Sequence, residues 1–248
     1  MGAKPNSLVV DSGTVDCFIY TYKDGFLARL AHDLKLRVER FHIVIKKDPY
    51  KTPQSRMKMH VRAVFDATSI RSVTAMKDGV ESPGTLKPWD HALIEQFMRI
   101  YVLKSGTFPE IVFKSTGFSR NSNRLRVNGT LTLRDSTRPL IITKKKGTRK
   151  MFAGGSALYQ PDFGIKPFSA FMGAIKIKPE VRIELQILQT QLEQVVTSNP
   201  DFFPKGLSAV RKMIQDLCFI PSGHGKKLKG GQRNQSSRCR PATAHMSL

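Results

Sequence analysis

Apolar and polar residues alternate along most of the chain between residues 16 and 186. A period of two is typical of β-strands that bury one face, and each alternating segment is bounded by Gly, Pro, Asn or Asp. Many strands at short spacing are typical of a β-sandwich or a β-barrel. The pattern therefore predicts an all-β domain, with strands at 17–23, 34–47, 56–67, 110–118, 124–134, 139–145, 151–159 and 174–187.

One segment between these strands has a helical period instead. It follows Asp90, a residue type favoured at helix N-caps, and it ends before Gly106. Its apolar residues recur at the spacing of one helix face, and they are Leu93, Ile94, Phe97, Met98 and Tyr101. We therefore expect an amphipathic helix that covers an opening or an edge of the sheet.

The pattern changes again after residue 188. Segments 188–200 and 204–221 predict two short helices, separated and followed by prolines. From residue 222 onward the chain has basic residues, no acidic residues and few apolar ones, which is typical of disorder. The predicted organisation is a β-domain at 1–188, a helical appendage at 189–221 and a disordered basic tail at 222–248.

Strand parity predicts that one face of the sheet is apolar throughout. The residues expected on that face are Ile111, Phe113, Val127, Gly129, Leu131, Leu133, Val181, Ile183, Leu185 and Ile187. Those expected on the other face are Lys114, Thr130, Thr132, Arg182 and Glu184. A barrel of about eight strands either packs solid with its own side chains or holds one slender ligand. Glycines within strands, such as Gly129, Gly154 and Gly155, fit both a bent wall and a close approach to a ligand.

Aromatic and branched apolar residues within the predicted strands and helix are candidates to line such a tunnel or to fill a core. Each buried CH₂ group of a ligand tail contributes about 0.8 kcal/mol, so an open channel has ample driving force to bind one. The candidate lining residues are Phe18, Tyr20, Phe26, Phe65, Phe97, Ile111, Phe113, Leu131, Leu133, Phe152, Phe163, Val181 and Ile183.

The charge of the chain makes acidic partners plausible. Its 41 Lys and Arg against 19 Asp and Glu give a formal net charge of +22. Nucleic acid, an anionic membrane surface and phosphorylated small molecules all fit this charge. The basic residues are spread over many strands, however, without the aromatic and basic motif of RNA-recognition domains. An alternative hypothesis is a basic β-barrel adaptor that binds nucleic acid or an anionic membrane through its surface and tail.

Signals for catalysis and for metal binding are weak. The three cysteines and six histidines lack the spacing of a zinc site. Asp135, Ser136 and Arg138 are near neighbours in one turn, whereas catalytic triads are assembled from separate elements. We therefore expect neither an enzyme nor a metal site. The first residues lack the pattern of a secretion signal, and no run of about 18 apolar residues is present, so a soluble cytoplasmic protein is expected.

Four segments, taken in order, resemble the signature blocks of a known family. They are DHALIEQFMRIYVLKSGTFPEIVFKSTGF, LRVNGTLTLRDSTRPL, ALYQPDFGIKPF and GAIKIKPEVRIELQI. The shared features are a Phe-Pro step after the helix, an I-x-F-x-S strand, a G-x-L-T hairpin that ends in Arg-Pro, a D-F-G-I loop and a terminal V-x-I-x-L strand. The chain thus resembles the YceI-like, or polyisoprenoid-binding, family.

The resemblance implies a lipocalin-like, eight-stranded antiparallel barrel that is closed by the helix and holds a long isoprenoid chain. It implies a carrier or storage protein, with no cofactor apart from a bound isoprenoid or quinone-like lipid. Residues expected near the head group of the ligand are His32, Asp33, Arg138 and Asp162. The chain departs from the family pattern at Asp135 and Ser136, where a glycine-containing turn is usual, and in the extra region after residue 188. The first hypothesis is therefore non-enzymatic binding of a long apolar lipid, either isoprenoid, quinone-like or fatty.

Overall fold

The computed structural model describes residues 6–25, 31–48, 59–121, 124–145, 151–170, 172, 174–203 and 206. The predicted tail at 222–248 lies outside these residues, as does the second predicted C-terminal helix apart from Gly206. The division of the chain at residues 188 and 221 therefore stays a prediction.

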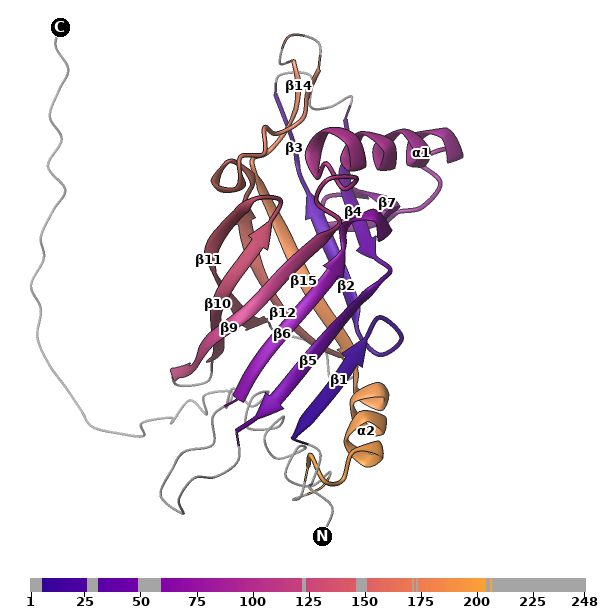
Figure 1. Ribbon diagram of the computed structural model, residues 1–248. Helices are drawn as coiled ribbons and strands as arrows, with labels where there is room; N and C mark the ends of the chain where they lie inside the picture. Colours follow the sequence, from indigo (N-terminus) through magenta and orange to yellow (C-terminus); the bar gives the residue numbers. More distant parts are fainter. Residues whose placement is uncertain are drawn as a thin grey trace, which may run out of the picture.

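The described residues form mainly one curled antiparallel sheet (Figure 1). Its 12 strands lie in the order β1-β5-β6-β9-β10-β11-β12-β15-β2-β4-β7-β8. Their bounds are β1 Ser7–Asp11, β2 Asp16–Thr21, β4 Asp33–Val38, β5 Phe41–Lys47, β6 Met59–Asp66, β7 Ile70–Lys77, β8 Val80–Ser82, β9 Glu110–Asn121, β10 Arg124–Leu133, β11 Ser136–Lys145, β12 Met151–Tyr159 and β15 Glu180–Leu188. The predicted β-dominated, lipocalin-like fold class is confirmed, but the count of eight strands is not exact.

A second sheet of three short strands extends the main sheet at one end. It consists of β13 (Ser169–Ala170), β14 (Ile175–Ile177) and β3 (Lys23–Asp24), in that order. In Figure 1 these strands lie beside α1, at the end of the molecule opposite to α2. We call this three-stranded unit the arm.

The sheet bends where two predicted strands break. The single strand predicted at 34–47 is divided into β4 and β5 by Glu39 and Arg40, and the 3₁₀-turn η2 (Ala67–Ser69) separates β6 from β7. The backbone N–H of Glu39 donates to the carbonyl of Ser69 over 3.1 Å, and that of Asp66 donates to the carbonyl of Arg40 over 2.9 Å. Because β5 pairs with β6 and β4 pairs with β7, the two segments turn this corner together.

An ion pair fixes the corner. The Arg40 guanidinium lies 2.8 Å from Asp66 Oδ2 and also donates to the Thr68 hydroxyl over 2.9 Å. Burial acts to raise the pKa of Asp66, but hydrogen bonds from Thr68 and Arg40 outweigh burial and hold this pKa below its ordinary value. The carboxylate therefore stays ionised and caps the turn by accepting the Thr68 N–H over 2.7 Å.

The predicted amphipathic helix is present as α1 (Pro88–Phe97), and a π-helical turn η3 (Met98–Val102) continues it. The prediction of Asp90 as the N-cap was wrong, because Lys87 is the N-cap and Pro88 begins the helix. Proline is favoured at the first helical position, where its fixed φ suits the helix and its missing N–H is not needed. Asp90 acts one turn later, where its Oδ2 accepts the Lys87 N–H over 2.8 Å.

The first predicted C-terminal helix is present as α2 (Gln189–Ser198), which follows β15 directly. After it, Phe202 is buried beneath Lys47 of β5. The Lys47 ammonium lies 3.8 Å from the centre of the Phe202 ring and donates to the Phe202 carbonyl. Burial lowers the pKa of Lys47 from its ordinary value. The segment after α2 is thus attached to the sheet at the end opposite to α1 (Figure 1).

The inner face of the curled sheet carries the predicted apolar surface. Phe113, Leu131, Leu133 and Val181 are buried, whereas Lys114 and Arg182, at positions of opposite parity, are exposed. The core also includes Cys17, Leu36, Val38, Phe41 and Ile70, which come from β2, β4, β5 and β7. Among the described residues, no helix is long and apolar enough to cross a membrane.

Candidate ligand cavity

A cavity of about 310 Å³ lies between α1 and the inner face of the sheet. The side chains around it come from strands on opposite sides of the curl, from α1 and η3, and from the segment between the 3₁₀-turn η4 (Gln160–Phe163) and the arm. Those from the strands are Ile19, Thr21, Leu34, Leu36, Ile70, Ile111, Leu131, Leu133, Leu158, Ile177, Val181 and Ile183. The others are Leu93, Ile94, Phe97, Met98, Val102, Leu103, Gln160, Ile165 and Phe168.

Only two of these side chains are polar. Gln160, in the 3₁₀-turn η4 (Gln160–Phe163), is buried, and its Nε2 donates to the Lys178 carbonyl over 3.1 Å. Thr21 ends β2, and its Oγ1 is buried without a hydrogen-bond partner in the described part of the chain. A buried hydroxyl without a partner costs about 1–3 kcal/mol, so a polar ligand atom that bonded to Thr21 would offset part of this cost.

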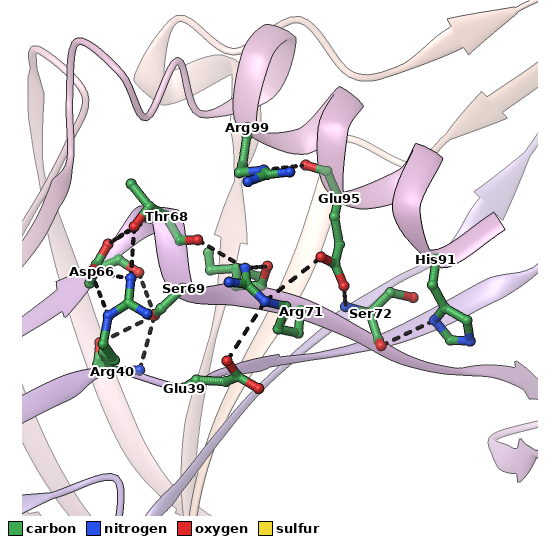
Figure 2. A network of polar contacts seen from close by, with 11 residues as sticks. Glu39, Arg40, Asp66, Thr68, Ser69, Arg71, Ser72, His91, Glu95 and Arg99 are labelled. Carbon is green, nitrogen blue, oxygen red and sulfur yellow. Dashed lines mark hydrogen bonds and ion pairs between the residues drawn. The ribbon is translucent and has the colours of Figure 1, made fainter. Parts of the chain in front are cut away.

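Polar contacts to the backbone at the edge of β7 hold α1 over the cavity (Figure 2). The carboxylate of Glu95 accepts the backbone N–H of Ser72 over 3.0 Å, and Nδ1 of His91 lies 3.1 Å from the Ser72 carbonyl oxygen. Because the carbonyl can only accept, His91 donates from Nδ1. Two side chains of one helix thus pair with both backbone groups of one strand residue.

Ser72 is available for these contacts because of the way β7 pairs with β4 and β8. The register between β4 and β7 shifts at Lys35 and Leu36, so Val73 forms a bulge, and β8 pairs with β7 only from Ala75 onward. The outward backbone groups of Ser72 would therefore lack a strand partner, as is usual beside a bulge at a sheet edge. The helix α1 covers this edge and supplies the missing partners.

Arg71 completes the network in Figure 2. Its Nε lies 3.7 Å from Glu39 and 3.8 Å from Glu95, and one of its terminal nitrogens donates to the carbonyls of Thr68 and Ile70. Glu95 is the better buried of the two acidic partners. The bend of the sheet and the helix over the cavity are therefore linked through one guanidinium.

The predicted lining residues divide into three groups. Phe97, Ile111, Leu131, Leu133, Val181 and Ile183 do line the cavity. Phe18, Tyr20, Phe65, Phe113 and Phe163 do not. Phe26 lies outside the described residues, and so does the side chain of Phe152. Ligand binding by the first group stays a prediction.

Phe18 and Tyr20 do not line the cavity, because β2 presents its alternate residues, Ile19 and Thr21, to it. The Phe18 ring faces outward, where Lys35 Nζ lies 3.9 Å from its centre and pairs with Glu81 over 2.6 Å. Burial, together with the charge of Glu184, raises the pKa of Tyr20 to about 12.

The other three aromatic residues fill core positions. The rings of Phe41 and Phe65 pack with their centres 5.3 Å apart. Phe163 is 2% exposed within η4 and does not reach the cavity surface. Phe113, also 2% exposed, lies against the backbone of Gly129. Part of the interior is thus packed solid, and the cavity lies at the end under α1.

The predicted head-group residues do not gather at the cavity, and none of the four lines it. His32, Arg138 and Asp162 are exposed. Asp33 accepts the backbone N–H of Lys23 over 2.8 Å, a contact that joins β4 to the arm. Within the described part of the chain, Arg138 donates to the neighbouring carbonyl of Thr137 over 3.1 Å. Contact of any of the four with the head group of a ligand stays a prediction.

In the β10–β11 turn, Arg134 makes a contact with the loop that follows η4. Its φ of +57° lies in the left-handed region, and it occupies the turn where a glycine was expected nearby. It donates to the Gly164 carbonyl over 3.0 Å and lies 6.0 Å from the centre of the Phe108 ring. This contact ties the hairpin to the loop that follows η4, and so positions Ile165 at the cavity.

The described cavity wall is apolar apart from Thr21 and Gln160. None of the described residues that line it carries a titratable side chain. In the same part of the chain, no group of three or more His, Cys, Asp and Glu side chains is close enough to hold a metal ion. What the cavity can do is exclude water from an apolar guest.

A curled antiparallel sheet with an apolar cavity under a short helix defines a lipocalin-like fold. The sequence pattern of the YceI-like domain matches residues 26–188. The chain therefore belongs to the YceI-like domain family. No curated protein matches the chain at a significant level.

Several solved structures are similar to this fold. BcnA of Burkholderia cenocepacia is 14% identical, with a TM-score of 0.47, over 72% of this chain and 98% of that one. A polyisoprenoid-binding domain from Saccharophagus degradans, implicated in plant cell wall breakdown, is 9% identical, with a TM-score of 0.43, over 74% and 97%. The YceI protein of Campylobacter jejuni is 13% identical, with a TM-score of 0.37, over 63% and 85%.

Proposed function

We propose that this protein binds a long apolar lipid, with the tail of the lipid in the cavity beneath α1. The observation that carries the proposal is the composition of the cavity wall, in which 21 residues include only Thr21 and Gln160 as polar side chains. Water in an apolar cavity would lose its hydrogen bonds, so an apolar ligand is the more favourable occupant. Membership of the YceI-like family supports the same function.

The size of the cavity favours a slender guest. Ligand pockets commonly span about 300–1,000 Å³, and this cavity of about 310 Å³ lies at the lower limit. A single isoprenoid or fatty chain suits such a volume better than a bulky ring system does. Each CH₂ group that enters gains about 0.8 kcal/mol, so a chain of modest length suffices for tight retention.

A polar end of the ligand has two candidate partners. Thr21, whose buried hydroxyl lacks a partner among the described residues, and Gln160 both line the cavity. Thr21 ends β2, just before the arm strand β3, and Gln160 bonds to Lys178, which follows the arm strand β14. We therefore infer that a hydroxyl, carbonyl or quinone-like oxygen of the ligand would lie toward the arm and the tail deeper between the strands.

Carriage or storage, rather than catalysis, fits this site. General acid or base catalysis needs a titratable group near the ligand, and nucleophilic catalysis needs an activated nucleophile. The described lining residues supply neither. The proposed function requires no cofactor besides the bound lipid.

The test is to purify the full chain from its own host and to identify co-purifying lipid by native mass spectrometry and solvent extraction. We expect a stoichiometric apolar lipid with a single slender tail. A protein that is reproducibly free of lipid, and that also fails to bind an added long-chain isoprenoid alcohol or fatty acid, would overturn the proposal.

A variant pair localises the binding. Ile183 lines the cavity beside Ile19, its cross-strand partner. Ile183→Trp therefore places a large ring in the cavity and should abolish lipid retention. Ile141→Trp makes the same substitution on an exposed position of β11 and should retain the lipid. Thermal unfolding of both variants separates a blocked cavity from a misfolded chain. Equal retention by the two variants would move the lipid out of this cavity.

A further inference from the structure

The exposed apolar side chains of this protein are concentrated at one end of the molecule. Of the 13 large apolar side chains that are exposed in the described part of the chain, seven belong to α1, η3 and the arm region. They are Trp89, Leu93, Phe97, Ile100, Tyr101, Phe168 and Met172. We call these seven residues the apolar rim. Single exposed apolar residues are ordinary on a protein surface, but a gathered set marks a contact surface.

The rim is continuous along the helix. Trp89, Leu93, Phe97 and Tyr101 follow one another at intervals of four, so they form one stripe along α1 and η3. The Phe97 ring lies 5.1 Å from the Tyr101 ring and 5.6 Å from the Phe168 ring, centre to centre. Phe168 thereby joins the helix stripe to the arm, which lies beside α1 in Figure 1.

The rim is also continuous with the cavity. Leu93, Phe97 and Phe168 line the cavity, and yet they are 53%, 38% and 37% exposed. The same three side chains therefore face the cavity on one side and the solvent on the other. An apolar chain that leaves the cavity past them would emerge within the apolar rim rather than in bulk water.

Basic residues outnumber acidic ones in the segments that carry the rim. Lys166, Lys176 and Lys178 are the charged residues of segment 165–179, which contains no acidic residue. On the helix side, Arg99 and Lys104 line an open hollow next to Ile100. Glu95 also lines this hollow, but its carboxylate contacts Ser72 and Arg71. Acidic residues lie here too, since Asp24 is the cross-strand partner of Lys176 in the arm and Asp90 lies in the first turn of α1. With Glu95 these are three acidic residues against the five basic ones named above, so the basic residues are in excess.

We propose that the apolar rim docks onto an anionic lipid bilayer. Tryptophan and tyrosine are favoured at bilayer interfaces, where an apolar body meets a polar edge. Amphipathic helices bind in the interface plane through buried apolar area and through attraction of basic residues to anionic lipids. Each Lys or Arg near such a surface contributes about 1 kcal/mol. Helix α1 and the arm supply both components at the mouth of the cavity.

The docking surface goes beyond the proposed function, because it concerns a membrane rather than the molecule in the cavity. It also differs from binding by the basic tail or by the general positive charge, since it requires particular apolar residues. A protein partner would use the apolar stripe without needing anionic lipid. The experiment below separates these cases.

The sequence provides a reporter, since its single tryptophan, Trp89, is 69% exposed on the rim. The full chain is mixed with vesicles of phosphatidylcholine alone and with vesicles of equimolar phosphatidylcholine and phosphatidylglycerol. We expect a blue shift of Trp89 emission and co-sedimentation with the anionic vesicles only, both weakened by added salt. Brominated lipid in those vesicles should quench the shifted emission, because the indole enters the interface.

Two double variants test the residues while Trp89 is kept. Ile100→Ser with Tyr101→Ser removes two exposed rim side chains and should weaken vesicle binding at least about tenfold. Val9→Ser with Ile141→Ser removes two similarly exposed side chains from β1 and β11 and should leave vesicle binding unchanged. Arg99→Gln with Lys104→Gln should weaken binding to anionic vesicles and reduce its salt dependence.

Three outcomes would overturn the proposal. The first is vesicle binding that the Ile100 and Tyr101 variant leaves intact, which would assign the binding to other basic surface. The second is equal binding to neutral and anionic vesicles, and the third is binding to neither, which leaves the stripe to a protein partner. Failure of the proposed function is visible separately, because Ile183→Trp should lose cavity lipid but keep vesicle binding.

Discussion

The ring of Phe113 occupies the space where Gly129 lacks a side chain. A Cβ at Gly129 would lie 2.6 Å from Phe113 Cε2 and 2.5 Å from the Lys114 carbonyl oxygen. The register of β9 and β10 shifts between Asn128 and Gly129, which is the bulge that brings the two strands into this contact. The glycine therefore serves packing within the wall, and a ligand does not approach the backbone there.

This contact predicts the effect of Gly129→Ala. The added methyl group would overlap a buried ring and a backbone oxygen, neither of which is the end of a flexible side chain, so we expect a loss of about 1–3 kcal/mol in the free energy of unfolding. The measurement is urea denaturation monitored by circular dichroism. Gly154→Ala is the control, because its nearest contacts would be at the ordinary distance of 3.7 Å and its stability should stay near that of the parent. Equal effects at both glycines would contradict the packing argument.

The contact between Glu95 and Ser72 predicts how the helix is held over the cavity. Glu95→Ala removes the acceptor of the Ser72 N–H and the partner of Arg71, and should cost about 1–3 kcal/mol of stability. We also expect faster release of a fluorescent fatty acid from the cavity, measured by stopped-flow displacement. Gln96→Ala, at an exposed position of the same helix, should change neither quantity. If Gln96→Ala releases the probe as fast as Glu95→Ala does, the helix is not held by this contact.

Alternation predicted most of the sheet because β9, β10 and β15 have a clear apolar face, with Ile111, Leu131 and Ile183 pointing inward. It did not predict the bend at Glu39 and Arg40. The sequence does carry a signal for the bend, since Val38 and Phe41 are both buried yet differ by an odd number of positions. A straight strand cannot bury both, so the change of phase indicates a corner.

The site was predicted less well than the sheet. In β2 all residues from Cys17 to Tyr20 are apolar or aromatic, so parity does not decide which set faces inward. Phe18 is stabilised on the outer face because Lys35 lies over its ring and pairs with Glu81. Both residues come from segments distant from β2 in the sequence. Strands β7 and β8 were not predicted, because a bulge interrupts the alternation of β7 and because α1, rather than a strand, pairs with Ser72.

The burial of Cys17 predicts its reactivity. Burial, together with the neighbouring charge of Asp16, raises the pKa of the Cys17 thiol to about 12, and the side chain is 2% exposed. Since the thiolate is the nucleophile, Cys17 should resist iodoacetamide in the native protein and react after denaturation. Mass spectrometry of digested protein measures labelling at each cysteine. Rapid native labelling of Cys17 at neutral pH would show that this core opens.

The same thiol predicts a loss of stability in alkali. Its pKa is about 12 in the folded state against an ordinary value of 9.0, so the contribution is fully present below pH 9 and is lost as the pH rises towards 12. At about pH 10.5 the expected loss from Cys17 is about 2 kcal/mol relative to neutral pH. Urea denaturation at both pH values measures it. The variant Cys17→Ala should lose correspondingly less between them, whereas an identical loss would contradict the burial of the thiol.

The unpartnered hydroxyl of Thr21 predicts opposite effects on the empty and the loaded protein. Thr21→Val keeps the shape of the side chain and removes a buried polar atom, so the empty protein should gain about 1 kcal/mol of stability. A ligand whose oxygen bonds to Thr21 should bind about tenfold more weakly, whereas a hydrocarbon chain without an oxygen should bind at least as well. Thr132→Val is the control, because its hydroxyl is 2.8 Å from that of Thr137 and outside the cavity. Calorimetric titration of a long-chain alcohol and of the matching alkane into both variants makes the comparison. Unchanged affinity for the alcohol in Thr21→Val would remove Thr21 as the polar contact and leave Gln160 as the one polar side chain in the described wall that could bind the head of the ligand.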